Sequence, residues 1–381
     1  MKIYQVGGCV RDELLGLPGA DRDWVVVGAT AEEMERLGYK PVGRDFPVFL
    51  HPETREEYAL ARTERKVSRG YKGFTVYAAP EVTLEEDLAR RDLTINAIAR
   101  DGEGRLVDPF GGERDLKAGI LRHVGPAFVE DPVRVLRVAR FAARFGFAVA
   151  PETLALMREI VAGGEADALV AERVWQEFAR GLMEPLPGRM FAVLALCGAL
   201  AKLAPELGLR FEADEPADEG TRVAMNALAW CAAAGHALAV RFGALARSAR
   251  DAGEPGLRAL CARLKAPAEC RDVALLCLRE LDRMRRAGQL TPQEKLALLE
   301  ACDAFRRPER FSDLLRAAEA ETRGERRAVE LPYAPRTVLE AALERARSVN
   351  AGAIAASSAR GEIAPRLRRA RIAAIAAGER R

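Results

Sequence analysis

The pattern of apolar residues changes near residue 125, and this change restricts the architectures open to the chain. Before it, short β-rich runs alternate with helical patterns and with Gly and Pro; the runs lie at 2–6, 23–28, 46–50, 56–61 and 74–79, and the helical patterns around 9–15, 31–37 and 84–98. After Pro132, Ala, Leu, Arg and Glu recur at helical spacing almost to the C-terminus. The sequence therefore predicts an α+β protein whose second half is all helical.

The length and composition fit a protein with more than one domain. A chain of 381 residues can form two or three domains, and 49% hydrophobic and 30% charged residues are ordinary for a globular protein. We expect domains at 1–125, 126–200 and 201–381. No repeat of fixed period is present, so a solenoid is not expected. The net charge of +3 argues neither for nor against a polyanionic partner.

The hydropathy pattern indicates a cytoplasmic protein. No stretch approaches the roughly 18 apolar residues that a membrane helix needs. The first residues carry charges where a signal peptide needs its apolar segment. We therefore expect a cytoplasmic location and no membrane partner.

Cysteine and histidine usage narrows the possible chemistry. The seven cysteines are scattered and form no C-x-x-C pair, so we expect free thiols, mostly in packing roles, rather than disulfides or a zinc site. His51, His123 and His236 lie far apart and without a metal-binding spacing. Histidine-based metal chemistry is therefore not expected.

A glycine turn follows the first expected strand. Gly7 and Gly8 separate an apolar run from a helical pattern, where backbone N–H groups can meet a phosphate that no side chain blocks. Arg11 comes one turn later and could reach the same anion. A dinucleotide-binding fold is not expected, because the G-x-G-x-x-G fingerprint is missing.

Two aspartates, Asp21 and Asp23, stand at the head of the next β-rich run. Alternate residues of a strand point to one face, so we expect both carboxylates to face the same site. Such a pair is costly unless a cation lies between the carboxylates, and hard oxygen ligands suit Mg²⁺ that bridges to substrate phosphates. The plainer interpretation is a solvated turn. The metal interpretation predicts two-metal phosphoryl transfer, with Asp21 and Asp23 as catalytic and metal-binding residues.

Together these segments resemble a known enzyme family. The segment from Gly7 to Asp12, followed by Asp21 and Asp23, is similar to the head domain of the nucleotidyltransferase superfamily that includes DNA polymerase beta. Within it, the chain looks most like the branch of bacterial CCA-adding tRNA nucleotidyltransferases and poly(A) polymerases. The resemblance implies a head with a mixed β-sheet, then a helical neck, body and tail. It also implies that the two aspartates hold the metal ions, with Glu57 as a candidate third carboxylate.

Two further strings extend the resemblance. The string RRDLTINA at 90–97 resembles the second motif of the family and implies that Arg91 contacts the incoming triphosphate, together with Gly8 and Arg11. Without the rest of the string, the adjacent arginines would indicate only a surface charge cluster. The loop at 108–116 resembles a family motif with a conformational role, a hinge between head and neck whose glycines permit a tight turn.

A helical segment at 130–144 carries four arginines at steps of three or four residues, namely Arg134, Arg137, Arg140 and Arg144. The pattern alone could be a solvated stripe, but the opposite positions are apolar and would pack. In the family, an Asp and an Arg of this motif read the Watson–Crick edge of the incoming base, which assigns that role to Asp131 and Arg134. A carboxylate accepts from an exocyclic amino group and a guanidinium donates to ring acceptors, a pattern that C and A satisfy.

The same resemblance implies roles for neighbouring residues. Arg137 and Arg140 would make further nucleotide or phosphate contacts. The string at 171–177 resembles the next family motif, in which Glu172 and Arg173 would brace the preceding helix. A plain amphipathic helix explains this string almost as well.

A local string favours tRNA over poly(A) specificity. Poly(A) polymerases of this branch carry a basic string and a His-rich signature after the carboxylate strand, where this chain reads GRDFPVFLH at 43–51. We therefore expect addition of CCA to tRNA from CTP and ATP, by a monomer or weak homo-oligomer. The alternatives are a poly(A) polymerase, an enzyme that adds only CC or only A, and an RNA-binding protein on an inactive scaffold. The intact carboxylate pair argues against the last.

The helical half departs from many relatives, which carry there a phosphohydrolase domain with metal-binding histidines and a His-Asp pair. Region 221–270 holds only His236, and Arg247 and Ser248 stand where the pair is expected. We expect the helical scaffold without hydrolase activity. Near the C-terminus, four arginines would contact tRNA phosphates or simply be solvated: Arg366, Arg368, Arg369 and Arg371.

Overall fold

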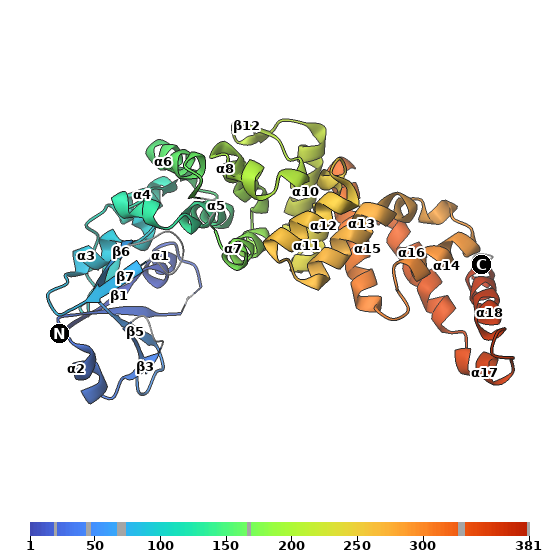
Figure 1. Ribbon diagram of the computed structural model, residues 1–381, viewed down its shortest axis with the longest axis horizontal. Coiled ribbons are helices and arrows are strands. Elements are labelled where there is room, and N and C mark those ends of the chain that lie inside the picture. The colour runs from blue at the N-terminus through green and yellow to red at the C-terminus, as the bar shows by residue number, and fades with distance from the viewer. Residues whose placement is uncertain (19–20, 43–46, 67–73, 166–168, 327–331, 379–381) are drawn as a thin grey trace. The chain divides into compact units, whose positions relative to one another are not determined.

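The computed structural model describes the chain apart from residues 19–20, 43–46, 67–73, 166–168, 327–331 and 379–381 (Figure 1). The described residues form two compact units. The first contains Met1–Gly181 and Arg189–Leu203, and the second contains Leu182–Gly188 and Ala204–Arg381. The expected border between residues 125 and 126 lies inside the first unit, so the division into three domains stays a prediction.

A seven-stranded sheet forms the centre of the N-terminal part, with the order β3-β4-β5-β2-β1-β8-β9. Its strands are β1 (Lys2–Val6), β2 (Asp23–Val27), β3 (Lys40–Val42), β4 (Val48–Leu50), β5 (Glu57–Leu60), β8 (Ala99–Arg100) and β9 (Leu106–Val107). A separate pair is formed by β6 (Arg62–Lys66) and β7 (Phe74–Ala78). In the large sheet β2 and β5 run parallel and the other neighbours run antiparallel, so the sheet is mixed, as expected.

Both faces of this sheet are covered by apolar side chains. Along β2, Val25 packs in a cluster with Leu88, whereas Val26 packs in a second cluster with Met34. Because side chains alternate along a strand, Asp23 lies on the same face as Val25. The two hydrophobic clusters therefore fix which way this carboxylate points.

Four helices belong to the same part of the chain: α1 (Gly8–Leu14), α2 (Ala31–Arg36), α3 (Leu84–Ala89) and α4 (Gly112–Ala118). Thr30 and Thr83 begin α2 and α3, each in a reciprocal pair with the glutamate three residues later. This arrangement satisfies backbone N–H groups that a helix start leaves without partners.

The single helix expected over 84–98 is wrong, because α3 stops after six residues. Farther along, Thr94 donates its backbone N–H to the carbonyl oxygen of Arg122 at 2.8 Å. The side chain of Asp92 accepts from the next backbone N–H at 2.9 Å, which competes with helical hydrogen bonding. After α3, the expected range contains only a short 3-10 helix, η1 (Thr94–Asn96).

Further helices follow the sheet: η2 (Pro126–Glu130), α5 (Val133–Phe145), α6 (Pro151–Ala162), α7 (Ala171–Met183), α8 (Pro187–Leu196) and α9 (Ala199–Leu203). Pro132 precedes α5, and Gly146 ends it in the left-handed region at φ 73°. A short parallel pair, β10 (Ile120–Leu121) and β11 (Ala148–Val149), lies on either side of α5 in the sequence.

The second unit is built from helices. They are η4 (Pro205–Leu207), α10 (Glu219–Ala233), α11 (Leu238–Ala244), η5 (Ala246–Ala249), α12 (Gly253–Leu264), α13 (Ala268–Arg285), η6 (Ala287–Gln289), α14 (Pro292–Ala301), α15 (Pro308–Arg326), α16 (Ala334–Arg347), α17 (Ala351–Ala356) and α18 (Ile363–Ala377). One group consists of α10, α11, α13 and α15, and another of α14, α16 and α18 (Figure 1). Among the described residues of the second half, the expectation of an all-helical structure is wrong at β11 and at the two-residue strands β12 (Phe211–Glu212) and β13 (Glu215–Pro216).

All seven cysteines are buried and form no disulfide, as expected for thiols in packing roles. Burial raises the pKa of Cys197 to about 11 and that of Cys302 to about 12. Within the described ranges, no helix combines the length and the apolar character that crossing a membrane requires.

Gly112 generates the first prediction, because α4 packs closely on η1 at this residue. A Cβ on Gly112 would overlap the Thr94 carbonyl oxygen and lie 2.7 Å from Cγ1 of Ile98. We expect Gly112→Ala to lower the free energy of unfolding by about 2 kcal/mol, since a packed backbone must shift. Gly102→Ala is the control, since a Cβ there meets no atom within 4 Å. If urea unfolding gave the same free energy of unfolding for the two variants, this packing would be contradicted.

Candidate active site

A cavity of about 510 Å³ lies in the first unit and collects most of the residues singled out from the sequence. It is lined by the β1–α1 turn, the start of β2, the segment after α3, and helices α5 and α7. Eight of the nine predicted site residues border it: Gly8, Arg11, Asp23, Arg91, Asp131, Arg134, Arg137 and Arg140. Asp21 is the exception. Segments distant in sequence thus meet at one polar site.

The carboxylate cluster is built around Asp23, the first residue of β2. In the parallel pair of β2 and β5, Asp23 lies directly beside Glu57. Asp21 precedes the strand, so strand geometry does not place its side chain, and the assignment of Asp21 to the site stays a prediction. Burial raises the pKa of Asp23; Arg91 opposes this, and the negative charges of Glu57 and Asp21 add to it. Both neighbouring carboxylates therefore act on Asp23 electrostatically.

The glycine turn brings Arg91 over the start of α1. Gly7 has φ 75°, and a Cβ on it would lie 2.6 Å from Nη1 of Arg91. Arg91 donates to the carbonyl oxygen of Asn96 at 3.2 Å and pairs with Asp87 at 3.4 Å. Burial lowers the pKa of Arg91, and the charge of Asp87 opposes that change. The cationic side chain of Arg91 thus lies where Gly7 leaves space.

Helix α5 presents its four arginines to the cavity, and acidic groups hold several of them. Nε of Arg137 donates to Asp92 at 2.7 Å, and Nε of Arg140 donates to Glu177 at 2.6 Å. Arg134 donates to two backbone oxygens, at 2.9 and 2.6 Å. The arginine face predicted from the sequence is therefore a set of oriented donors rather than a solvated stripe.

Asp131, just ahead of α5, is oriented by Arg173 of α7. Nη1 and Nη2 of Arg173 donate to the two carboxylate oxygens of Asp131 at 3.2 and 2.8 Å. The backbone N–H of Val133 donates to the same carboxylate at 3.2 Å. The bracing expected from Arg173 is thus present as a two-point contact. Its neighbour Glu172 lies in the first turn of α7, and Glu177 supplies that helix's contact to Arg140.

Asp92 carries a charge that the sequence did not single out. Burial alone would raise its pKa, but Arg137 and the hydrogen bonds from Asn96 and Arg137 outweigh burial and bring the pKa to about 2. The string RRDLTINA contains both Asp92 and Asn96, so these two residues could have been identified from that motif. The sequence also did not indicate that Arg144, which borders the cavity, forms an ion pair with Asp12 at 2.8 Å.

Comparison with known proteins decides the family. The model of the poly(A) polymerase head domain matches residues 3–122, and that of a probable RNA- and SrmB-binding site of polymerase A matches 146–209. A Multifunctional CCA protein of Chromobacterium violaceum is 56% identical and covers 94% of this chain and 93% of its own length. The chain belongs to the family of multifunctional CCA proteins. The family expected from the sequence is confirmed.

Other members of the family and its solved structures agree. A Multifunctional CCA protein of Laribacter hongkongensis is 53% identical and covers 100% of this chain and 99% of its own length. The crystal structure of the Bacillus stearothermophilus CCA-adding enzyme in complex with CTP has a TM-score of 0.71 at 25% identity, covering 99% of this chain and 89% of that one. The expected head with a mixed sheet followed by helical regions is thereby confirmed.

Membership of the CCA family implies a divalent metal ion, and the carboxylates near Asp23 fit one. Their donor atoms are hard oxygens, and a cation would offset both the burial of the Asp23 carboxylate and the smaller repulsion from Glu57 and Asp21, which together raise the pKa of Asp23. Within the described ranges, no group of three or more His, Cys, Asp or Glu side chains is arranged so that it could hold a metal ion by itself.

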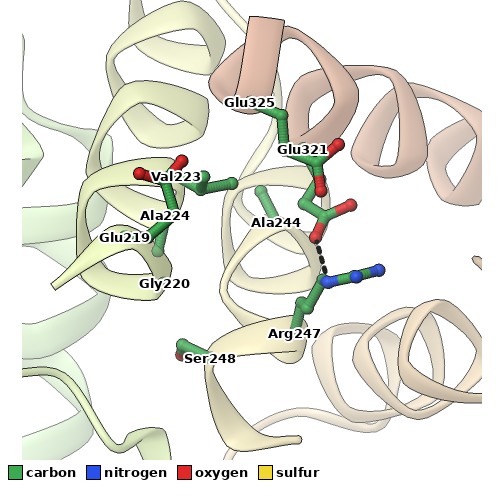
Figure 2. A pocket seen from close by; sticks show the side chains of 9 residues that line it. All are labelled: Glu219, Gly220, Val223, Ala224, Ala244, Arg247, Ser248, Glu321 and Glu325. Carbon is green, nitrogen blue, oxygen red and sulfur yellow. Dashed lines mark ion pairs between the residues drawn. The ribbon is translucent and has the colours of Figure 1, made fainter.

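A second cavity, of about 430 Å³, lies among α10, α11, η5 and α15 of the CCA-family fold (Figure 2). Arg247 and Ser248, which replace the expected His-Asp pair, are among its lining residues. Nε of Arg247 pairs with the buried carboxylate of Glu321 at 3.0 Å. Burial raises the pKa of Glu321 to about 7, against the charges of Arg285 and Arg247. An ion pair thus occupies this region.

The string at 43–51, used to favour tRNA, lies partly outside the described residues.

Asp92→Asn tests the charge that holds Arg137. We expect the free energy of unfolding at pH 7 to fall by about 3 kcal/mol, because Arg137 loses a largely buried partner. A depressed carboxylate pKa stabilises the folded state above the ordinary pKa of Asp and loses this effect as pH falls toward 2. The difference between wild type and variant should therefore shrink below about pH 4.

The control for this measurement is Glu113→Gln, which removes an exposed pair with Lys117. It should change stability by less than about 1 kcal/mol. Urea unfolding at pH 7, 5 and 3.5 gives both comparisons. An Asp92→Asn deficit that is the same at all three pH values would contradict the assigned charge.

Proposed function

We propose that this chain adds CCA to the 3′ end of tRNA from CTP and ATP, without a nucleic-acid template and with release of pyrophosphate. The observation that carries the proposal is the cavity of the first unit, which borders Asp23, Arg91, Asp131 and Arg134. It offers carboxylates for metal-dependent chemistry, a cation for phosphates and a donor–acceptor pair for a base. The names of the relatives, Multifunctional CCA protein, support the same activity.

The reaction joins the tRNA 3′-oxygen to the α-phosphorus of the nucleotide and breaks the bond to the β-phosphate. Asp23, with Asp21 and Glu57 next to it, would hold Mg²⁺. When bound, the ion lowers the pKa of the 3′-hydroxyl and offsets the negative charge of the triphosphate. No covalent intermediate on the protein is needed.

Arg91 and the glycine turn would bind the triphosphate. Burial removes water from the Arg91 guanidinium, which strengthens its attraction for an anion. Gly8 has no side chain to obstruct the phosphates. Arg137 and Arg140 add positive charge from α5, and each is oriented by an acid at 2.7 or 2.6 Å.

Asp131 and Arg134 would read the base. The carboxylate of Asp131 can accept from the exocyclic amino group of C or A, and the guanidinium of Arg134 can donate to a ring acceptor. Because Arg173 already orients Asp131 at two points, little rearrangement is needed on binding. A protein surface thereby replaces the template.

The tRNA would be held by phosphate contacts to the helical part, including the arginines of α18. Arg366, Arg368 and Arg369 are exposed, whereas Arg371 lies over the ring of Phe305 at 4.0 Å. Such contacts read shape and charge rather than sequence, as an enzyme for many tRNAs requires. A cytoplasmic location, Mg²⁺ as the metal, and a monomer or weak homo-oligomer complete the proposal.

The experiment is to incubate the protein with Mg²⁺, CTP, ATP and a tRNA transcript that lacks CCA, and to sequence the 3′ end. We expect C, C and A followed by a stop. Asp23→Ala should lower the rate by about three orders of magnitude, because it removes a metal ligand. Glu35→Gln, at an exposed residue of α2, is the control. Undiminished addition by Asp23→Ala would refute the assignment of this site.

The match to a poly(A) polymerase head domain supports one rival function, poly(A) synthesis, and the same assay tests it. A long A tract would indicate poly(A) polymerase, and termination after CC, or addition of A only to a tRNA ending in CC, would indicate a partial enzyme. The absence of any extension would favour an RNA-binding protein on an inactive scaffold.

The second cavity generates a separate prediction about hydrolysis. Its Arg247–Glu321 pair replaces side chains that would bind a metal. We expect no metal-dependent hydrolysis of 2′,3′-cyclic phosphates above the background of a heat-denatured sample. Hydrolysis by pure protein that a chelator abolishes would contradict this expectation.

A further inference from the structure

We propose that Asp87 is a positioning residue for the incoming nucleotide, because it holds Arg91 in the orientation that binds the triphosphate. The inference rests on the proposed function, in which Arg91 contacts the phosphates. Asp87 lies near the end of α3 and is 0% exposed. It cannot touch a nucleotide itself, so any effect on binding has to pass through Arg91 or through the fold.

The buried carboxylate of Asp87 joins three segments of the chain. Its Oδ1 atom accepts from Nη2 and Nε of Arg90 at 2.7 and 3.1 Å. The same atom accepts from the backbone N–H of Arg62, the first residue of β6, at 3.3 Å. Its Oδ2 atom accepts from Nη2 of Arg91 at 3.4 Å. One side chain of α3 therefore meets the start of β6 and both arginines that follow the helix.

The charge of Asp87 is essential to this arrangement. Burial alone would raise its pKa, but the charges of Arg90 and Arg91 outweigh burial and keep the pKa below the ordinary value of Asp. The carboxylate is thus ionised at neutral pH. Arg90 and Arg91 repel each other, and a carboxylate that accepts from both offsets this repulsion. Without the charge, the two guanidiniums would move apart.

Arg91 is held at its two terminal nitrogens. Nη1 donates to the carbonyl oxygen of Asn96 at 3.2 Å and lies close to Gly7, whereas Nη2 faces Asp87. Nε is buried and, within the described part of the chain, has no hydrogen-bond partner. These contacts do not exhaust the N–H donors of a guanidinium. Arg91 therefore has a fixed orientation and can still donate to an anion in the cavity that it borders.

The base-reading side chain Arg134 also meets this segment, but in a different way. Its Nη2 atom donates to the backbone carbonyl oxygen of Arg90 at 2.6 Å, whereas Asp87 binds the side chain of Arg90. Loss of the Asp87 charge should therefore disturb the phosphate site more than the base site. A purely structural role for Asp87 would instead weaken both sites together.

Asp87→Asn is the main test, because it keeps the shape of the side chain and removes its charge. Incorporation of CTP into a tRNA lacking CCA is measured with two competitive inhibitors, inorganic tripolyphosphate and cytidine. We expect Ki for tripolyphosphate to rise about tenfold, since a hydrogen bond to a charged group is lost or misdirected. KM for CTP and for ATP should rise by the same factor. Ki for cytidine should change by less than about twofold.

Two results of this experiment would overturn the inference. An equal rise of Ki for tripolyphosphate and cytidine would mean that Asp87 serves only the fold. Stronger binding of tripolyphosphate would mean that Asp87 merely neutralises Arg91, because removal of a negative charge by itself favours an anion.

Glu85→Gln is the matched control. Glu85 is an exposed residue of the same helix, and its substitution makes the same change in net charge. It should leave Ki for tripolyphosphate within about twofold of wild type. Thermal unfolding of each variant shows whether it is folded under the assay conditions.

A double-mutant cycle shows whether Asp87 acts through Arg91. Arg91→Lys alone should raise Ki for tripolyphosphate. Asp87→Asn added to Arg91→Lys should then raise it by less than a further factor of about two. A second rise as large as that of Asp87→Asn alone would mean that Asp87 acts elsewhere, and would overturn the inference.

Asp87→Glu replaces Asp87→Asn if the latter does not fold. It keeps a charge for both arginines and displaces the carboxylate by one methylene. Ki for tripolyphosphate should rise in the same direction by a smaller factor, again without a matching rise for cytidine. An unchanged Ki for tripolyphosphate in a folded Asp87→Glu variant would refute the positioning role.

Arg91→Lys also distinguishes this failure from failure of the proposed function. If Arg91→Lys leaves Ki for tripolyphosphate unchanged, Arg91 is misassigned as a phosphate ligand, and the role of Asp87 is refuted with it. If Arg91→Lys raises this Ki while folded Asp87 variants do not, the assignment of Arg91 stands and the Asp87 inference alone is refuted.

Discussion

The placement of four arginines on one face of a helix is the constraint on which the first unit depends. Unpaired guanidiniums packed against a protein interior would be costly. Each of three arginines of α5 meets a carboxylate from another element: Asp92 after α3, Glu177 on α7 and Asp12 on α1. Charge compensation therefore also assembles the unit, because the acids come from distant parts of the sequence.

The same ion pairs hold the arginine side chains in fixed orientations while these side chains still give the cavity a positively charged lining. Acids bind the arginines along one edge of each guanidinium, and the arginines still border the cavity. A triphosphate meets donors whose orientation is already determined, so less conformational entropy is lost on binding. The carboxylates around Asp23 stand apart from this set, since β2 and β5 place them by strand register.

Much of this arrangement could be predicted from the sequence. The β-rich runs located five strands, and eight of the nine residues that the motifs assigned to the site do border the cavity. Local patterns fail where tertiary partners decide. The helix expected through 84–98 is interrupted because residues 92–94 hydrogen-bond to 122–124, and Asp21 falls outside a strand whose first residue is Asp23. The burial of Arg11 depends on Asp12, Asn96 and two rings of α5, none of which a linear motif identifies as its partners.

The buried cysteines have a practical consequence for handling the protein. The thiolate is the form that oxidants and alkylating reagents attack, and burial keeps Cys231 and Cys302 protonated at any ordinary pH by raising each pKa to about 12. In the folded molecule these thiols are therefore inaccessible to reagents, and opening of the helical core would expose them. The extent of maleimide labelling would consequently measure the fraction of molecules with an open core, and the native cysteines would serve as the reporter.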